Sequence, residues 1–195
     1  MSKSEQLSIL YSRYREEFQG EEIVVGDGNH DSSLLLIGEA PGKDEVANSK
    51  PFVGMAGKNL AQFLEVLGLK RDEIYITNAI KHRLSKINPS TGRVSNRPAT
   101  REEIEKNRNY LIDEIDIIRP GIIVTLGNVP LRSVVGDHKA SIGEVHGTLG
   151  KVSIKEIEYG LYPLYHPASI IYNASLKEIY VNDVENLKRV IAMEF

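Results

Sequence analysis

The sequence predicts an α/β protein built on a parallel, doubly wound sheet. Four short apolar runs have the length and composition of buried parallel strands. Segments with apolar residues at helical spacing separate these runs along the chain. Because parallel strands need long crossover connections, this alternation favours that class of fold. The four runs are Leu34–Ile37, Ile74–Thr77, Ile122–Leu126 and Leu161–Tyr165.

The predicted helices follow from apolar spacing and from signals at their ends. Residues 4–18 are typical of a polar helix, and residues 56–67 carry apolar side chains three and four positions apart before Gly68 ends the pattern. Thr100 and Glu103 form a capping box, so we expect a helix to begin there. The remaining expected elements are a short extended piece at 23–26, a short helix at 127–135, a hairpin or loop crossing over 143–160 and a closing helix over 176–192.

Size and composition bound the class of protein. The 195 residues suit a single domain spanning residues 1–195. No apolar run approaches the length of a membrane span, and the polar first residues do not resemble a signal peptide, so a cytoplasmic location is expected. The chain has no cysteine, which excludes disulfides, a cysteine nucleophile and thiolate metal sites.

Positive charge is concentrated in one segment of an otherwise acidic chain. Residues 81–108 hold eight Lys or Arg and three Glu, a balance of +5, whereas the whole chain has a formal charge of −3. Residues 81–99 also have the pattern of a long loop, and long loops in compact domains are often functional. Two interpretations stay open: a surface that binds a polyanion, or a solvated loop beside a charged helix face.

Four unusual side chains fall at or near the ends of the predicted strands. Glu39 follows the first strand within a Gly- and Pro-rich turn, Asn78 follows the second, and His166 follows the fourth. Phe52 lies in the loop after the first strand. Taken singly, these residues could be a solvated acid, a helix cap, a surface histidine and a core ring. Because the carboxyl ends of parallel strands share one edge, together they predict a pocket for a small molecule or a base.

Five motifs in order make the sequence resemble the uracil-DNA glycosylase superfamily, and most closely its family 4. The resemblance extends from about residue 11 to residue 190 and implies a three-layer α/β/α sandwich with a central four-stranded parallel sheet. The motifs are Gly38–Gly42, Pro51–Gly54 with Ala56–Lys58, Tyr75–Asn78, Asn96–Pro98 and Tyr165–Ala168.

The resemblance implies removal of uracil from DNA by a monofunctional enzyme, with named residues in named roles. Glu39 and His166 are the expected catalytic residues. Asn78 is expected to read the base and Phe52 to stack on it. The uracil-binding set is completed by Gly38 and Ala40 of the turn and by Glu45, which is expected near C5 of the base.

The expected partner is uracil-containing DNA, with uracil as product, and the protein is expected to act as a monomer. Ile170 and Ile171 are candidates for a wedge that fills the gap left by the extruded base, or for a simple helix start. The candidate phosphate contacts are Lys58, Lys81, Arg83, Arg93 and Arg97.

One departure from the family pattern concerns a cofactor. Family 4 enzymes hold a [4Fe–4S] cluster through four cysteines, and this chain has Tyr11, Tyr14, His82 and Asn107 at the corresponding places. A cluster needs thiolates, and one histidine with one amide makes a poor metal site. We therefore expect a relative without a cluster, with no metal and no organic cofactor.

Three other functions share these features. A non-catalytic nucleic-acid-binding protein of the same fold is one, although the four pocket side chains argue against it. A glycosylase for another deaminated base is the second. The third, a hydrolase of free nucleosides or nucleotides, would not need the basic segment at residues 81–108.

Overall fold

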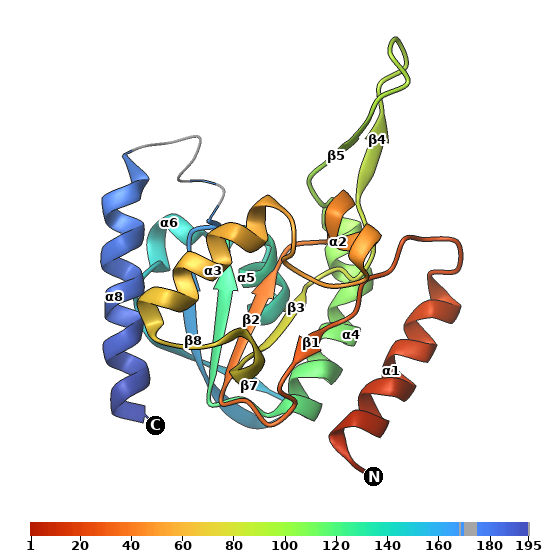
Figure 1. The fold of residues 1–195 in the computed structure, drawn as a ribbon. Coiled ribbons are helices and arrows are strands. Elements are labelled where there is room, and N and C mark those ends of the chain that lie inside the picture. Colours follow the sequence, from red (N-terminus) through yellow and green to blue (C-terminus); the bar gives the residue numbers. More distant parts are fainter. Residues whose placement is uncertain (168, 170–174, 195) are drawn as a thin grey trace.

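The computed structural model describes residues 1–167, 169 and 175–194, and it has a mixed, mostly parallel sheet at its centre (Figure 1). The strand order is β1-β3-β2-β6-β8-β7, in which the four inner strands run parallel and the two edge strands are antiparallel to their neighbours. The strands are β1 (Asp27–Gly28), β2 (Leu34–Gly38), β3 (Tyr75–Asn78), β6 (Ile122–Leu126), β7 (Gly150–Ile154) and β8 (Ile157–Leu164).

The predicted fold class is confirmed, and the strand count is corrected. The four expected strands are the four parallel ones, but the sheet has six strands because one more strand pairs at each edge. The region expected as a hairpin or loop crossing is the β7–β8 hairpin, so the last core strand begins at Ile157 rather than Leu161. The predicted extended piece near Ile23 makes a single bridge to His82.

Helices cover both faces of the sheet, and the alternation of strand side chains decides which helix meets which residue. Leu34 and Leu36 pack with α3 and α8, whereas Leu35 and Ile37 pack with α1, α4 and α5 on the other face. Every residue of β2 is buried, as expected for an inner parallel strand. The helices are α1 (Lys3–Glu17), α2 (Lys43–Asn48), α3 (Met55–Leu67), α4 (Arg101–Ile118), α5 (Asn128–Val135), α6 (Ile142–Val145) and α8 (Leu176–Glu194), with a short 3-10 helix η1 (Arg71–Glu73).

The segment expected as one long loop contains a second, separate sheet. Strands β4 (Ser85–Ile87) and β5 (Val94–Asn96) pair with each other and rise above the main sheet (Figure 1). The predicted capping box is confirmed just after it, because the Thr100 hydroxyl accepts from the Glu103 N–H at 3.2 Å and the Glu103 carboxylate accepts from the Thr100 N–H at 2.8 Å. No helix among the described residues is long and apolar enough to cross a membrane.

A buried ion pair joins α4 to the segment after β3. The Lys81 ammonium lies against the Glu114 carboxylate, and the two side chains are 1 % and 0 % exposed. The same ammonium donates to the Asn78 carbonyl at 2.6 Å, and the carboxylate accepts from the hydroxyls of Thr77 and Tyr75 at 3.1 and 3.2 Å. These bonds compensate the cost of burying both charges.

We expect Glu114→Gln to lower the free energy of unfolding by about 3 kcal/mol, because it leaves the Lys81 ammonium buried without its counter-charge. Urea unfolding followed by circular dichroism measures this loss. Glu102→Gln, at an exposed position of the same helix, is the control. The double variant Lys81→Met/Glu114→Leu should lose less than Glu114→Gln, since it buries no charge. Equal losses in Glu114→Gln and Glu102→Gln would contradict this account of the pair.

Candidate active site

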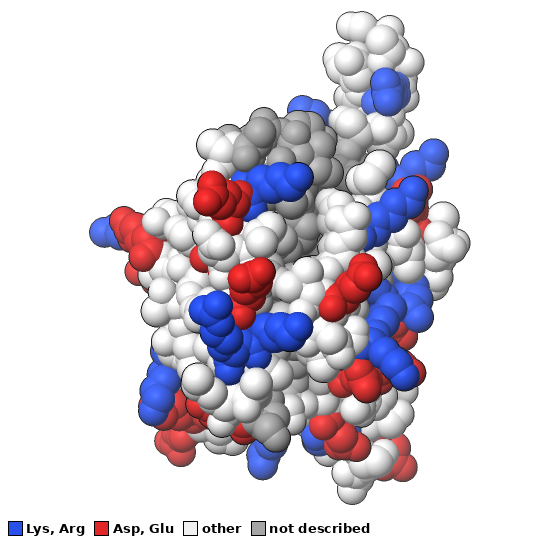
Figure 2. Space-filling view, turned by 60° about the vertical axis from the view of Figure 1, so that its left-hand side comes forward, with Lys and Arg blue, Asp and Glu red and all other residues white. Residues whose placement is uncertain are grey.

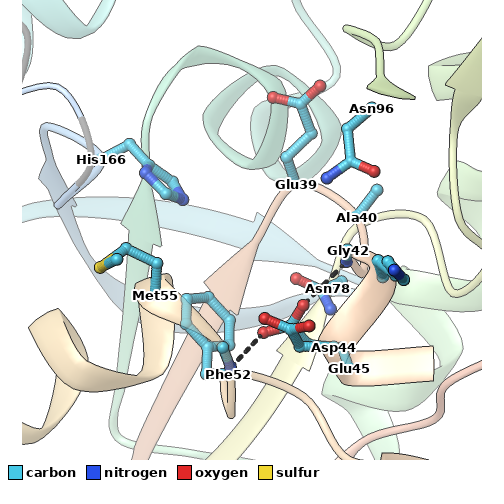
Figure 3. A pocket seen from close by; sticks show the side chains of 12 residues that line it. Glu39, Ala40, Gly42, Asp44, Glu45, Phe52, Met55, Asn78, Asn96 and His166 are labelled. Atoms are coloured by element: carbon cyan, nitrogen blue, oxygen red, sulfur yellow. Dashed lines mark hydrogen bonds between the residues drawn. The ribbon is translucent and has the colours of Figure 1, made fainter. Parts of the chain in front are cut away.

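A cavity of about 450 Å³ opens at the carboxyl edge of β2, β3 and β8. Figure 3 shows Phe52 and Asn78 at its base, His166 and Met55 on one side, and Asn96 and Ala40 on the other. All four side chains that predicted a pocket contribute to its lining. The lining residues are Glu39, Ala40, Gly42, Lys43, Asp44, Glu45, Phe52, Gly54, Met55, Asn78, Asn96 and His166.

The base of the cavity depends on the absence of a side chain at Gly38. In the parallel register Gly38 lies beside Asn78. A Cβ atom at Gly38 would lie 2.4 Å from Asn78 Oδ1 and 2.5 Å from Phe52 Cζ. The ring and the amide therefore both approach the backbone of β2 more closely than any other residue would allow. This contact places the aromatic edge and the side-chain amide together on one floor.

The ring of Phe52 is carried by a strained stretch of backbone. Phe52 has φ 53°, in the left-handed region that a bulky residue rarely adopts. Arg71 of η1 donates to the carbonyls of Pro51 and Phe52 at 2.5 and 3.1 Å. Asp27 lies 3.5 Å from the same guanidinium. No motif in the sequence points to Arg71, because its side chain bonds to backbone carbonyls and to an acid far away in the chain.

Glu45 holds the same stretch from the other side. Its carboxylate accepts from the N–H groups of Val53 and Gly54 at 3.1 and 2.9 Å, and from that of Gly42 at 3.0 Å. Both oxygens are thus bonded to backbone. A position near C5 of a bound base stays a prediction, whereas the contacts of Glu45 in the structure are those of a residue that shapes the loop.

Glu39 and His166 occupy the upper walls. One oxygen of Glu39 accepts from the Ala99 N–H at 3.0 Å, which ties the turn after β2 to the end of the segment 81–99 that contains the β4–β5 hairpin. His166 lies two residues beyond the end of β8. Burial lowers the pKa of His166 below its ordinary value of 6.5, so its imidazole is neutral at pH 7. The cavity therefore has both a carboxylate held by a backbone N–H and a neutral histidine in its lining.

The predicted phosphate contacts separate into buried and exposed groups. The prediction for Lys81 is wrong, because its side chain is buried against Glu114 and cannot reach a phosphate. Arg83 has a side chain only 10 % exposed, which bonds to Asn96 and lies near Glu22. Charge counted along a sequence does not reveal such internal pairing.

The remaining predicted phosphate contacts are either already in an ion pair or exposed to solvent. Arg97 makes a two-bond ion pair with Glu103, which lowers the pKa of that carboxyl to about 2. Lys58 on α3 and Arg93 in the β4–β5 hairpin are exposed. The predicted wedge residues Ile170 and Ile171 lie outside the described residues.

Comparison with known proteins gives a consistent result. The family model for the uracil DNA glycosylase superfamily matches residues 25–188. The chain belongs to this superfamily. It is 38 % identical over 171 residues to a type-4 uracil-DNA glycosylase of Sulfurisphaera tokodaii, covering 86 % of this chain and 74 % of the relative. Type-4 uracil-DNA glycosylases of Archaeoglobus fulgidus and Thermotoga maritima are 35 % and 34 % identical, with 84 % and 88 % of this chain and 79 % and 84 % of the relatives covered.

The residues expected at the family's cluster positions do not fit an iron–sulfur cluster. Three of the four come together: the Tyr14 hydroxyl lies 2.8 Å from His82 Nδ1 and donates to Asn107 Oδ1. Tyr11 instead bonds to Tyr75 and Glu114. The chain offers no thiolate, and the imidazole and the amide each bond to the tyrosine hydroxyl. A hydrogen-bonded polar cluster thus joins α1, the segment after β3, and α4.

We expect Gly38→Ala to abolish ligand binding in the cavity, because the added methyl group overlaps Asn78 and Phe52. Binding of uracil, measured by ligand-observed NMR, tests this. Gly143→Ala is the matched control, since a Cβ there meets nothing closer than 3.8 Å. If Gly38→Ala bound uracil as the parent protein does, the ring and amide would not form the binding floor.

We expect the stability of the protein to fall on acidification, in part through His82. Burial lowers the pKa of His82 below 6.5, so the unfolded chain takes up this proton first as pH falls. The contribution is lost progressively from about pH 6.5 downward. Urea unfolding at pH 7.5 and 5.5 should show a smaller difference in His82→Gln than in the parent protein. An unchanged difference in His82→Gln would refute the assignment.

Proposed function

We propose that this protein hydrolyses the N-glycosidic bond of uracil in DNA. The observation that supports this best is the cavity itself, which has an aromatic ring and a side-chain amide together on its floor and a carboxylate and a neutral histidine on its walls. Membership of the uracil-DNA glycosylase superfamily and the names of the type-4 relatives support the same activity. The substrate is then uracil-containing DNA, and uracil is the product.

Base recognition falls to Phe52 and Asn78. The Asn78 amide can accept from N3–H of uracil and donate to O4 at the same time. Cytosine presents the opposite polarity at both atoms, which would leave buried groups unpaired at about 1–3 kcal/mol each. The Lys81 bond to the Asn78 carbonyl keeps this residue's backbone in place. The Phe52 ring offers a face for the extruded base.

The leaving group is stabilised by His166. As the bond between C1′ of the sugar and N1 of uracil breaks, its electron pair passes to the base, and negative charge develops on O2. A neutral imidazole can donate an N–H to that oxygen without bringing its own positive charge into a buried site. Because this bond strengthens as charge develops, it lowers the barrier rather than only improving binding.

The sugar side of the reaction falls to Glu39. Its carboxylate can orient a water molecule toward C1′ and stabilise the positive charge that develops on the deoxyribose. The Ala99 N–H holds one of its oxygens and leaves the other for these roles. The water oxygen bonds to C1′, and its proton restores neutral uracil.

The mechanism is proposed to be monofunctional, with water as the nucleophile. The cavity does have one lysine, Lys43, which sequence reasoning did not place there, but it is an exposed residue of the rim. A lysine that forms a Schiff base is normally activated by desolvation or by a neighbouring charge. The proposal includes action as a single-domain monomer in the cytoplasm.

Cleavage of labelled oligonucleotides tests the proposal directly. The substrates carry uracil in a single strand, opposite guanine and opposite adenine, with hypoxanthine and free deoxyuridine as comparisons. Release of uracil from DNA alone supports the proposal. Preference for hypoxanthine would indicate a glycosylase for another base, and binding of DNA without cleavage would indicate a non-catalytic protein. A covalent adduct after borohydride treatment would contradict the monofunctional mechanism.

We expect Asn78→Asp to lose uracil excision by at least about a hundredfold, because a carboxylate cannot donate to O4. Single-turnover excision with uracil and cytosine substrates measures both rate and selectivity. Asn109→Asp, an exposed amide on α4, is the control and should behave as the parent protein. Unchanged excision by Asn78→Asp would remove this residue from base recognition.

A further inference from the structure

A two-stranded hairpin projects beyond the body of the protein at the same edge of the sheet as the cavity (Figure 1). Ile87 and Val94 lie opposite each other in its register, and they are 68 % and 46 % exposed. A two-stranded hairpin by itself is at best marginally stable in water. An exposed apolar pair on such a projection therefore favours a partner that covers it.

The hairpin is held at both ends. At its base the Arg97 N–H donates to the Leu84 carbonyl at 3.0 Å, and Leu84 itself is buried. At its tip the Asn88 side chain accepts from the N–H groups of Ser90 and Thr91 at 2.9 and 3.2 Å. These bonds define the turn and the register, so the two faces of the hairpin present a defined set of side chains.

The two faces differ in chemistry. Side chains two positions apart on a strand share a face, and so do directly paired residues. Val94 therefore lies on the same face as Asn96, which lines the cavity, and its partner Ile87 does too. Lys86 and Arg93 alternate with these residues and lie on the other face. The apolar pair thus occupies the cavity side of the hairpin, about 7 Å farther out than Asn96.

The charge of this region favours a polyanion over a second protein. The sequence has no Asp or Glu from residue 74 to residue 101. In Figure 2 the projecting hairpin shows a blue patch and no red, whereas both colours are mixed over the body. Sugars and base edges offer apolar surface beside phosphates, which is the combination that this hairpin would match.

The length of the hairpin indicates which part of the DNA it meets. From Asn96 to the tip it extends roughly 15 Å, at 3.3 Å per residue. A DNA groove is about 8 Å deep, and a two-stranded ribbon fits the wider one. A hairpin of this length beside the cavity reaches past the strand whose nucleotide is held there.

We propose that the β4–β5 hairpin enters a groove of duplex DNA and contacts the strand opposite the one that carries uracil. Ile87 and Val94 pack against sugars and base edges near the extruded nucleotide, and Lys86 and Arg93 contact phosphates across the groove. The inference rests on the proposed function, and it adds a preference for duplex over single-stranded substrate that the cavity alone does not supply.

The variant Ile87→Thr/Val94→Thr tests the apolar pair while keeping β-branched residues in the hairpin. Fluorescence anisotropy measures binding to a uracil·guanine duplex and to the same strand alone. We expect duplex binding to weaken by about tenfold and single-strand binding to change much less. Ile9→Thr/Val181→Thr, which alters two exposed apolar residues on α1 and α8, is the control and should change neither value.

Equal weakening for duplex and single strand would overturn the inference, and so would no change for either. A concentration-dependent mass in sedimentation that disappears in the hairpin variant would assign the apolar pair to a second copy of the chain instead. Binding is measured separately from cleavage. If the parent protein bound duplex through the hairpin but released no uracil, the proposed function alone would fail.

The cationic face has its own test. Lys86→Ala/Arg93→Ala should flatten the dependence of duplex affinity on salt by roughly 0.9 in logarithmic slope for each phosphate that the variant no longer neutralises. The control with the same change of charge is Lys151→Ala/Lys155→Ala, which alters one residue of the edge strand β7 and one residue just after it. Equal slopes for the two variants would show that only overall charge matters and would remove Lys86 and Arg93 from the interface.

Discussion

The buried pair of Lys81 and Glu114 connects the packing of the protein to its cavity. Neither charge could be buried without the other, and each bonds to groups of β3 or the residues that follow it. Lys81 bonds to the carbonyl of Asn78 and so holds the backbone of a residue on the cavity floor. Through Glu114 the pair fastens α4, whose first turn begins at the end of the hairpin segment. The buried ion pair therefore also fixes the position of Asn78, the residue proposed to recognise the base.

The elements that sequence patterns predicted are those whose patterns reflect burial. The inner strands are fully buried, and an unbroken apolar run such as Leu34–Ile37 is the direct result. The two-residue strand β1 is too short to leave a pattern. Strands β4 and β5 have the sequence pattern of a loop because their side chains lie exposed or half-buried on both faces, so neither face carries an apolar signal. Only their pairing, not their composition, makes them strands.

Site residues that follow the ends of parallel strands could be predicted from the sequence. Site residues whose side chains bond to backbone groups could not. Asn78 and His166 could be placed near each other because parallel strands end at one edge. The hydrogen bonds that Arg71 and Glu45 make to backbone groups leave no recognisable pattern of residue spacing in the sequence. The prediction for Lys81 was wrong because its partner is 33 positions away, and a charge in a basic segment is normally solvated. A count of charges along the sequence does not show which charged residues form pairs across the fold.

The support of the Pro51–Gly54 stretch has a consequence for redesign of the pocket. Arg71 holds carbonyl oxygens and Glu45 holds N–H groups, so both act on atoms of the main chain rather than on side chains. The path of this loop therefore does not depend on which side chain stands at position 52. Leucine there would keep the same backbone path, whereas a β-branched residue would add strain at a positive φ, and tyrosine would add a hydroxyl at the ring carbon that already lies against Gly38. The side chain at position 52, which faces a bound base, can therefore be exchanged while the backbone of the Pro51–Gly54 stretch keeps its path.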